Sequence, residues 1–293
     1  MADGSPNPET FNRLIVETRP RLHRYCARMV GSAFDGEDVV QETLMKAAEA
    51  FENAGHIERP ENWLFRIAHN AALDALRRRK RQPAMQSDVD LAYLADDSAS
   101  ADMRVAAAAS LATLMHLPAA QRSSVVLMDV LGHSLAETAE ILGVSVPSVK
   151  ASLHRGREHL RELAGGPEGV APQVSADDRD RLRTYADQFN ARNFDALRDL
   201  LADDVRLDLV NRTHLTGRKD VSVYFTRYEA VSDWRFSLGL AEGRPALLVS
   251  DPADTASTVS HVVLLDWTNG QIARIRDFKY APYVMESLAI SSL

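Results

Sequence analysis

The chain has 293 residues, which is enough for about two or three domains. It carries 34 basic and 41 acidic side chains, and the net charge of −7 excludes a protein that coats nucleic acid through bulk positive charge. A single cysteine, Cys26, excludes an internal disulfide, and its apolar neighbours at helical spacing favour a buried core position. No apolar run reaches the roughly 18 residues of a membrane span, and the start MADGSPNPET lacks a signal-peptide pattern, so we expect a cytoplasmic protein.

Helical periodicity runs through residues 9–82. Gly31 and Gly55 are typical of positions just after a helix, and Pro60 and Pro83 bracket a third segment, so three helices are predicted. The second helix has an acidic face opposite its apolar one, made of Asp38, Glu42, Met45 and Glu49. By periodicity alone, this face is either solvated or a docking site for a basic partner.

The third predicted helix ends in the basic run RRRKR, residues 77–81. Five cations at a helix C-terminus interact favourably with its dipole and can also bind phosphates. Trp63 begins this helix, where it either packs in the core or stacks on a base. The segment after it, residues 83–108, is acidic and rich in alanine and serine, which indicates a flexible linker.

Residues 109–164 are again helical and contain a candidate helix-turn-helix. Ser134 and Glu137 have the spacing of a capping box, Gly143 supplies a turn, and Ser145 is an N-cap for a second helix. Helical spacing turns Val149, Leu153, Gly156 and Leu160 inward and puts Lys150, Ala151, His154 and Arg155 on the opposite side. This pattern is typical of DNA binding, although an amphipathic helix pair with solvated arginines remains an alternative.

The sequence pattern changes from purely helical to mixed helix and strand after a glycine- and proline-rich linker at 165–176. Two helices are predicted, ADDRDRLRTYADQFNARN and FDALRDLLADD, and five strands follow, at 205–210, 234–242, 245–251, 258–267 and 272–280. Asn269-Gly270 between the last two strands is a strong hairpin signal.

The segments DGEDVVQETLMKAAEAF and RPENWLFRIAHNAALDALRRRKR together resemble region 2 of sigma-70 factors of the extracytoplasmic-function (ECF) group. The segment LMHLPAAQRSSVVLMDVLGHSLAETAEILGVSVPSVKASLHRGREHLREL resembles region 4 of the same group. The remaining chain, about 130 residues longer than a minimal ECF factor, resembles SnoaL-like domains.

The resemblance implies a multidomain protein with two all-α sigma domains and an α+β, cone-shaped SnoaL-like domain. Its expected parts are a region 2 bundle at 9–82, a linker at 83–108, region 4 with the helix-turn-helix at 109–164, a linker at 165–176 and the SnoaL-like domain at 177–293.

The resemblance also implies a role for each surface, with core RNA polymerase (its β′ clamp and β flap) and promoter DNA as partners. Polymerase binding is expected at Asp35, Asp38, Val39, Gln41, Glu42 and Met45. Contacts to the −10 element are expected at Asn53, His56, Trp63, Arg66, Asn70, Arg77, Arg78 and Lys80, with the loop 53–60 placed to capture a flipped base. Contacts to the −35 element are expected at Ser145, Pro147, Ser148, Lys150, Ala151, His154, Arg155 and Arg157.

For the tail, a ligand pocket is expected at Asp208, His214, Tyr224 and Asp266, with Asp277 a further candidate carboxylate. No spacing singles out a catalytic residue, so we expect a regulatory domain without enzymatic activity, metal or cofactor, able to sense a small ligand or contact the rest of the chain. Two alternatives remain: a stand-alone helix-turn-helix regulator with a ligand domain, and an isomerase or cyclase fused to a DNA-binding module.

Overall fold

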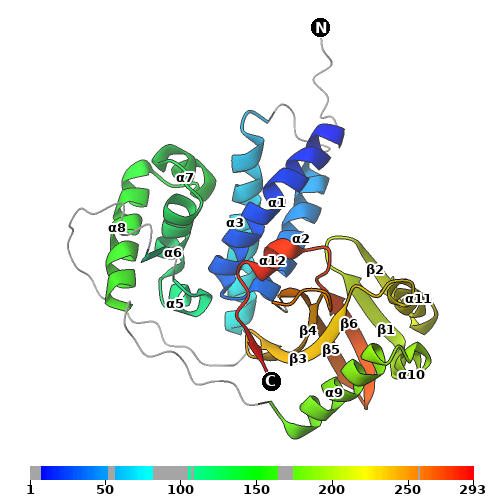
Figure 1. The fold of residues 1–293 in the computed structure, drawn as a ribbon. Helices are drawn as coiled ribbons and strands as arrows, with labels where there is room; N and C mark the ends of the chain where they lie inside the picture. Colours follow the sequence, from blue (N-terminus) through cyan, green and yellow to red (C-terminus); the bar gives the residue numbers. More distant parts are fainter. Residues whose placement is uncertain (1–7, 52–56, 82–104, 107–108, 164–173, 257) are drawn as a thin grey trace. The chain divides into compact units, whose positions relative to one another are not determined.

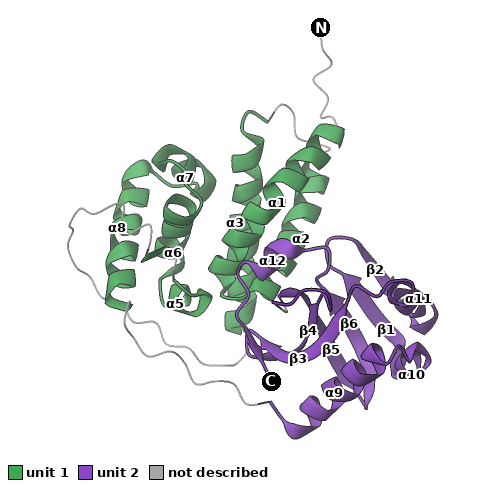
Figure 2. Cartoon of the chain, in the orientation of Figure 1, with its two compact units in different colours: residues 1–168 green, residues 169–293 purple. Residues whose placement is uncertain are grey.

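The computed structural model describes residues 8–51, 57–81, 105–106, 109–163, 174–256 and 258–293. Its contacts divide the chain into two compact units, residues 1–168 and residues 169–293, and each is described by itself (Figure 2). Among the described helices, none combines the length and the apolar character that a bilayer crossing needs.

Unit 1 begins with three helices that pack side by side, α1 (Pro8–Val30), α2 (Ala33–Phe51) and α3 (Pro60–Arg81) (Figure 1). The predicted stop after α1 is confirmed, because Gly31 has a φ of 81°, which favours glycine. The predicted stop at Gly55 lies outside the described residues. The buried core of this bundle includes Leu22, Tyr25 and Phe65 together with the predicted core residue Cys26.

A close helix crossing explains a glycine inside α2. A Cβ atom built on Gly36 would lie 2.6 Å from the backbone of Ala27 on α1, closer than atoms of a packed core approach one another. The absence of a side chain at Gly36 therefore lets α1 and α2 approach backbone to backbone.

The rest of unit 1 comprises the short helices α5 (Leu111–Met115) and α6 (Ala119–Val125), a π-helical turn η1 (Val126–Val130), α7 (Leu135–Leu142) and α8 (Val146–Leu163). The predicted capping box is confirmed: the Glu137 amide donates to Ser134 Oγ, and the Ser134 amide donates to a carboxylate oxygen of Glu137. Gly143, with a φ of 67°, ends α7, and the Ser148 amide donates to Ser145 Oγ at the start of α8. The local signals for a helix-turn-helix therefore produce that motif.

Unit 2 opens with α9 (Ala176–Asn190) and α10 (Phe194–Asp199) and then forms a curved sheet. Its strands are β1 (Leu201–Leu209), β2 (Thr213–Thr216), β3 (Arg235–Ala241), β4 (Arg244–Ser250), β5 (Val259–Thr268), β6 (Gln271–Asp277) and β7 (Ile290–Ser292). Within the described residues their order is β2-β1-β6-β5-β4-β3-β7, with β1 and β6 parallel and the other neighbours antiparallel. Asn269 and Gly270 both have positive φ, as the predicted β5–β6 hairpin requires.

Helices cover one face of this sheet. α9 lies against β3 and β4, and α11 (Arg218–Glu229) lies against β1 and β2; a short helix, α12 (Pro282–Met285), precedes β7 (Figure 1). The core between helices and sheet is rich in aromatic rings, including Tyr185, Phe189, Phe225, Trp234 and Phe236. Two helical modules followed by an α+β domain confirm the predicted fold class.

Candidate nucleic-acid interface and ligand pocket

The second helix of the helix-turn-helix presents a small, polar and basic face to solvent. Val149, Leu153, Gly156 and Leu160 are buried, as their spacing predicts. A Cβ atom on Gly156 would lie 2.7 Å from the side chain of Val125, so this glycine permits close packing of α8 on α6. The residues left exposed at the start of α8 are Ser145, Pro147, Ser148, Lys150, Ala151 and Arg155, and His154 is half-buried.

Arg157 differs from its neighbours on α8. Its guanidinium donates two hydrogen bonds to the Asp129 carboxylate, from Nε at 3.0 Å and from a terminal nitrogen at 2.7 Å. The Asp129 side chain is 2% exposed and that of Arg157 is 19% exposed. The structure thus assigns Arg157 a packing contact between η1 and α8, away from the solvent-facing side.

The acidic face expected on α2 is largely exposed. Asp35, Asp38 and Met45 are exposed, Gln41 and Glu42 are half-buried, and Val39 is buried in the helical core. The carboxylate of Glu42 accepts a 2.8 Å hydrogen bond from Arg78 and lies 2.8 Å from Lys46 Nζ. The Arg78 hydrogen bond lowers the pKa of Glu42, so this carboxylate is anionic at neutral pH.

The residues expected to contact the −10 element follow α3. Arg66, Asn70, Arg77, Arg78 and Lys80 are exposed, whereas Trp63 is half-buried against the helical core. Arg77 pairs with Asp74 one turn before it, at 2.8 Å. Asn53 and His56, expected in the adjoining loop, lie outside the described residues.

The start of α3 is tied to the first helix of the helix-turn-helix. Arg59 and Asn62 donate to the Glu140 carboxylate on α7 at 2.9 and 2.8 Å, and Arg66 donates to the Glu140 carbonyl oxygen at 3.1 and 2.5 Å. Ile141 of α7 is buried in the core that α1, α2 and α3 form. We call this set of contacts the α3–α7 clasp. One of its members, Arg66, is an arginine that we expect at the −10 element.

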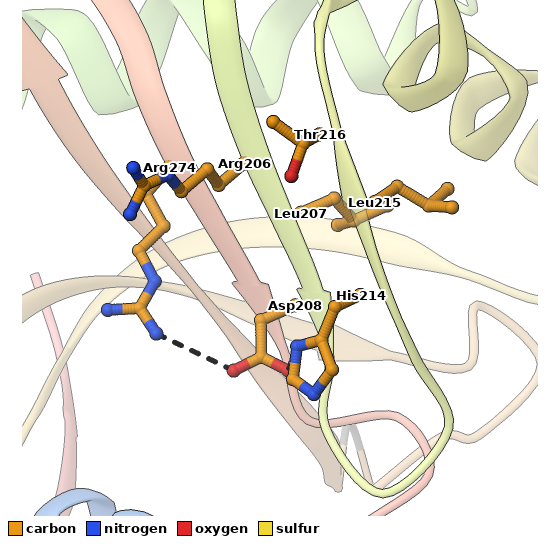
Figure 3. Close-up of a pocket in the computed structure, with 7 residues that line it drawn as sticks. All are labelled: Arg206, Leu207, Asp208, His214, Leu215, Thr216 and Arg274. Carbon is orange, nitrogen blue, oxygen red and sulfur yellow. Dashed lines mark ion pairs between the residues drawn. The ribbon is translucent and has the colours of Figure 1, made fainter.

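In unit 2 the structure divides the four residues expected to share a ligand pocket. Asp208 and His214 line one pocket of about 220 Å³ on the sheet face opposite the helices, beside Arg206, Thr216 and Arg274 (Figure 3). Asp266 is exposed and faces Arg274 across the β5–β6 pair without lining the pocket. Tyr224 belongs to the core on the helix-covered face, so it does not join Asp208 and His214.

Strand pairing explains how the pocket forms. Arg206 on β1 is opposite Thr216 on β2 and Arg274 on β6. Two residues along β1, Asp208 is opposite His214 and Arg276. Because side chains alternate between faces along a strand, all of these side chains emerge on one face of the sheet.

The helix-covered face contains a second polar cluster. The carboxylate of Asp277 is fully buried and accepts hydrogen bonds from Tyr224 Oη at 3.0 Å and Tyr228 Oη at 2.8 Å. His261 Nε2 lies 3.6 Å from the same carboxylate. Burial, followed by the charge of Asp277, raises the pKa of Tyr224, and burial lowers the pKa of His261. Both tyrosines are therefore protonated hydrogen-bond donors.

Five residues of these two clusters were not predicted from the sequence: Arg206, Thr216, Arg274, Tyr228 and His261. The first three become neighbours only through the register of β1 with β2 and β6, which single-sequence reasoning does not fix. Tyr228 had a signal, since it follows Tyr224 by four residues and therefore shares its helix face.

Comparison with known families matches three parts of the chain. Sigma-70 region 2 matches residues 14–82, Sigma-70 region 4 matches residues 110–160, and the SnoaL-like domain matches residues 182–275. The three matches follow one another in the order expected from the motifs.

Curated relatives agree with these matches. The ECF RNA polymerase sigma factor SigM of Mycobacterium tuberculosis is 33% identical over 155 residues, which cover 53% of this chain and 77% of SigM. SigG of the same organism, also an ECF RNA polymerase sigma factor, is 28% identical over 293 residues, covering 89% of this chain and 78% of SigG. The crystal structure of the M. tuberculosis ECF sigma factor SigJ is 20% identical, with a TM-score of 0.36, and covers 92% of this chain and 95% of SigJ.

The chain therefore belongs to the extracytoplasmic-function group of RNA polymerase sigma factors and carries a SnoaL-like domain after region 4. Its function is that of a sigma factor in transcription initiation. The alternative of a stand-alone helix-turn-helix regulator is not favoured, because the region 2 match adds a module that such a regulator does not need.

Proposed function

We propose that α2 docks on core RNA polymerase, at the β′ clamp, while region 4 reaches the β flap. The proposal rests on the acidic and polar face of α2, where Asp35, Asp38 and Met45 are exposed and Gln41 and Glu42 are half-buried. An acidic face is suited to a basic partner, because complementary charge speeds encounter and fixes register. Val39 is buried and would support this face from beneath. Promoter binding with core polymerase takes place in the cytoplasm.

We further propose that α3 and its preceding loop contact the −10 element and that α8 enters the major groove at the −35 element. The observation that carries this assignment is the exposed start of α8, where Ser148, Lys150, Ala151 and Arg155 share the side away from the core. Small residues at a helix N-terminus allow close approach to phosphates, and an arginine one to two turns later can contact a guanine edge. Arg157 would act indirectly, by holding α8 on η1.

We propose a regulatory, non-catalytic role for the SnoaL-like domain, as a sensor that changes sigma activity. In support, the Asp277 cluster is buried beneath packed rings: Phe189 stacks on Phe236 at 4.0 Å and contacts Tyr228 edge-on at 5.2 Å. A general base needs access to substrate at hydrogen-bond distance, and Asp277 is 0% exposed.

Run-off transcription with purified core polymerase tests the whole proposal. The full chain is compared with a chain that ends at residue 165. The promoter is taken from the DNA upstream of the gene that encodes this chain. We expect promoter-specific transcripts with the full chain and a severalfold change in their yield without the SnoaL-like domain. Equal yields would contradict the regulatory role, and no transcript from either chain on a pool of promoters would contradict the promoter assignment.

Variants separate the two surfaces. Asp38→Ala and Gln41→Ala are expected to weaken core polymerase binding, whereas Lys150→Ala is expected to weaken −35 recognition and leave core binding intact. Arg179→Ala, which changes an exposed residue of α9, is the matched control for surface charge. Normal core binding by the two α2 variants would contradict the docking assignment.

A further inference from the structure

The pocket on the sheet face opposite α9 and α11 has unmatched positive charge at Arg206. Arg206 and Arg274 are direct cross-strand neighbours. Their positive charges repel each other unless a negative charge lies nearby. Asp208 lies 3.7 Å from a terminal nitrogen of Arg274 and 3.5 Å from Arg276 Nε. Arg206 has no ion pair or side-chain hydrogen bond within the described residues. Asp208 therefore faces the guanidinium groups of Arg274 and Arg276, and Asp266 is opposite Arg274 on the next strand, but neither carboxylate pairs with Arg206.

The same pocket contains an acceptor that lacks a donor. Asp208 is 4% exposed, and its Oδ1 atom is buried without a hydrogen bond. His214 Nδ1 lies 3.1 Å away but does not complete a hydrogen bond to it (Figure 3). A buried carboxylate oxygen without a donor is unusual, because its lost hydration has no replacement.

We propose that this pocket binds a small organic acid that carries a hydrogen-bond donor beside its carboxylate, as α-hydroxy and α-amino acids do. The ligand carboxylate bridges Arg206 and Arg274, since guanidinium groups bind planar carboxylates through paired N–H groups. The neighbouring hydroxyl or ammonium group donates to Asp208 Oδ1, and the Thr216 hydroxyl, at the edge of the pocket, adds a further contact. Both unmet requirements of the pocket are then satisfied by one molecule.

The dimensions agree with a ligand of this size. The pocket, of about 220 Å³, is much larger than the space that one water molecule needs and has room for a three- or four-carbon acid. The site also lies on the opposite side of the sheet from the Asp277 cluster, so the two are chemically separate.

Ligand binding is measured on the full chain by titration calorimetry and saturation-transfer NMR. The probes are L-lactate and L-serine, with acetate and propionate as carboxylates that lack the adjacent donor. We expect lactate, serine or both to bind about tenfold more tightly than acetate or propionate, because they alone supply a donor to Asp208. The two probes distinguish a hydroxy acid from an amino acid.

Variants assign the binding to the pocket. Arg206→Ala should weaken binding about tenfold, and it removes no contact of the described fold. Asp208→Asn should remove the preference over acetate. Arg235→Ala, which changes an exposed arginine on β3, should leave affinity unchanged within about twofold. Circular dichroism establishes that each variant is folded.

Equal binding of acetate, propionate and lactate, or unchanged affinity in Arg206→Ala, would overturn the proposal. Ligand binding in this pocket would give the proposed sensing role its chemical signal. Only the effect of the ligand on transcription depends on that proposed role. Binding is measured without polymerase, so a failure to bind would leave the regulatory role standing, and a failure of the truncation experiment would leave the pocket standing.

Discussion

Arg155 and Arg157 are two residues apart on α8 and have different environments. Arg155 is exposed, whereas Arg157 is paired with an Asp129 side chain that is 2% exposed. The sequence of α8 offers two equivalent cations, because the partner that distinguishes them lies 28 residues earlier. An arginine in a recognition helix therefore has to be assigned to DNA or to the fold by its contacts.

Substitution of the two arginines should give opposite phenotypes. Arg155→Ala is expected to cost about 1–3 kcal/mol in −35 binding, the range for a guanine contact, with little change in the free energy of unfolding. Arg157→Ala leaves Asp129 buried without its partner and should lower the free energy of unfolding by about 3 kcal/mol. Urea unfolding and promoter binding by the polymerase holoenzyme measure the two effects. A stable Arg157→Ala protein with a selective promoter defect would contradict this distinction.

His69 makes the stability of unit 1 depend on pH. It is buried on α3, its Nδ1 lies 2.8 Å from Tyr25 Oη, and burial lowers its pKa from 6.5 to about 4. The folded protein thus binds this proton less readily than the unfolded chain does. The resulting stability is present above pH 6.5 and is lost as the pH falls towards 4.

Between pH 7 and pH 5, this one group should reduce the free energy of unfolding by about 2 kcal/mol. Urea unfolding followed by the helical signal at 222 nm measures the change, because unit 1 supplies most of the long helices. In His69→Gln, which cannot be protonated, the pH dependence should be smaller by that amount. The same slope in both proteins would show that His69 is not the group responsible.

At the scale of elements, the α3–α7 clasp joins Arg66, which we propose contacts the −10 element, to the helix-turn-helix. Arg66 donates to the Glu140 carbonyl oxygen and so cannot contact DNA through the same N–H groups. If Arg66 contacts the −10 element as proposed, promoter binding by both modules requires the clasp to open. The Glu140 carboxylate contributes to it through Arg59 and Asn62, in pairs that are partly exposed and thus individually weak.

Glu140→Ala should shift unit 1 towards open forms by less than about 1 kcal/mol, a change of up to about fivefold in population. The measurement is fluorescence transfer between dyes on cysteines introduced at exposed Glu49 and Glu162, with the buried Cys26 left in place. Glu17→Ala, on an exposed face of α1, is the control. Identical transfer distributions in Glu140→Ala and the control would indicate that this carboxylate does not hold the clasp.

Elements differed in how far they could be predicted. The helix-turn-helix was predictable because its signals are local: a capping box, a glycine of positive φ and an N-cap serine. α11 was not assigned, although Val221, Tyr224, Phe225 and Tyr228 recur at helical spacing. Its β-branched and aromatic composition resembles that of a strand, and here packing on β1 overrides propensity. The four-residue strand β2 is too short to show a period of two.

The candidate sites differed in the same way: local patterns were predictable from the sequence, and contacts between distant strands were not. The exposed face of α8 follows from helical geometry and was predicted almost completely. Both the acidic and the imidazole residue of the pocket, Asp208 and His214, were predicted, but its arginines were not. Arg206 and Arg274 come from β1 and β6 and are 68 residues apart along the chain. Strand alternation identifies which residues share a face, and only the register identifies which of them meet.

At the scale of the whole molecule, each unit has its own apolar core. The core of unit 2 draws its buried members from Leu182 to Ile275, all within the SnoaL-like domain. Within the described part of unit 1, two cores draw theirs from Phe11 to Leu160. A domain that has its own core can change its state without unfolding the sigma domains, which is what the proposed sensing role needs.

Residues 174–293 are therefore expected to fold as an isolated domain. About 120 residues with a closed aromatic core should unfold in a single cooperative transition with an enthalpy of about 80 kcal/mol near 60 °C. Differential scanning calorimetry of the isolated domain measures the transition, and agreement between calorimetric and van't Hoff enthalpies tests its cooperativity. Phe189→Ala, which removes the ring that contacts Phe194, Trp234 and Phe236, should destabilise it by about 3–5 kcal/mol. A broad, non-cooperative melt of the unsubstituted domain would mean that its core is incomplete without the preceding 173 residues, and sensing would then involve folding of the domain itself.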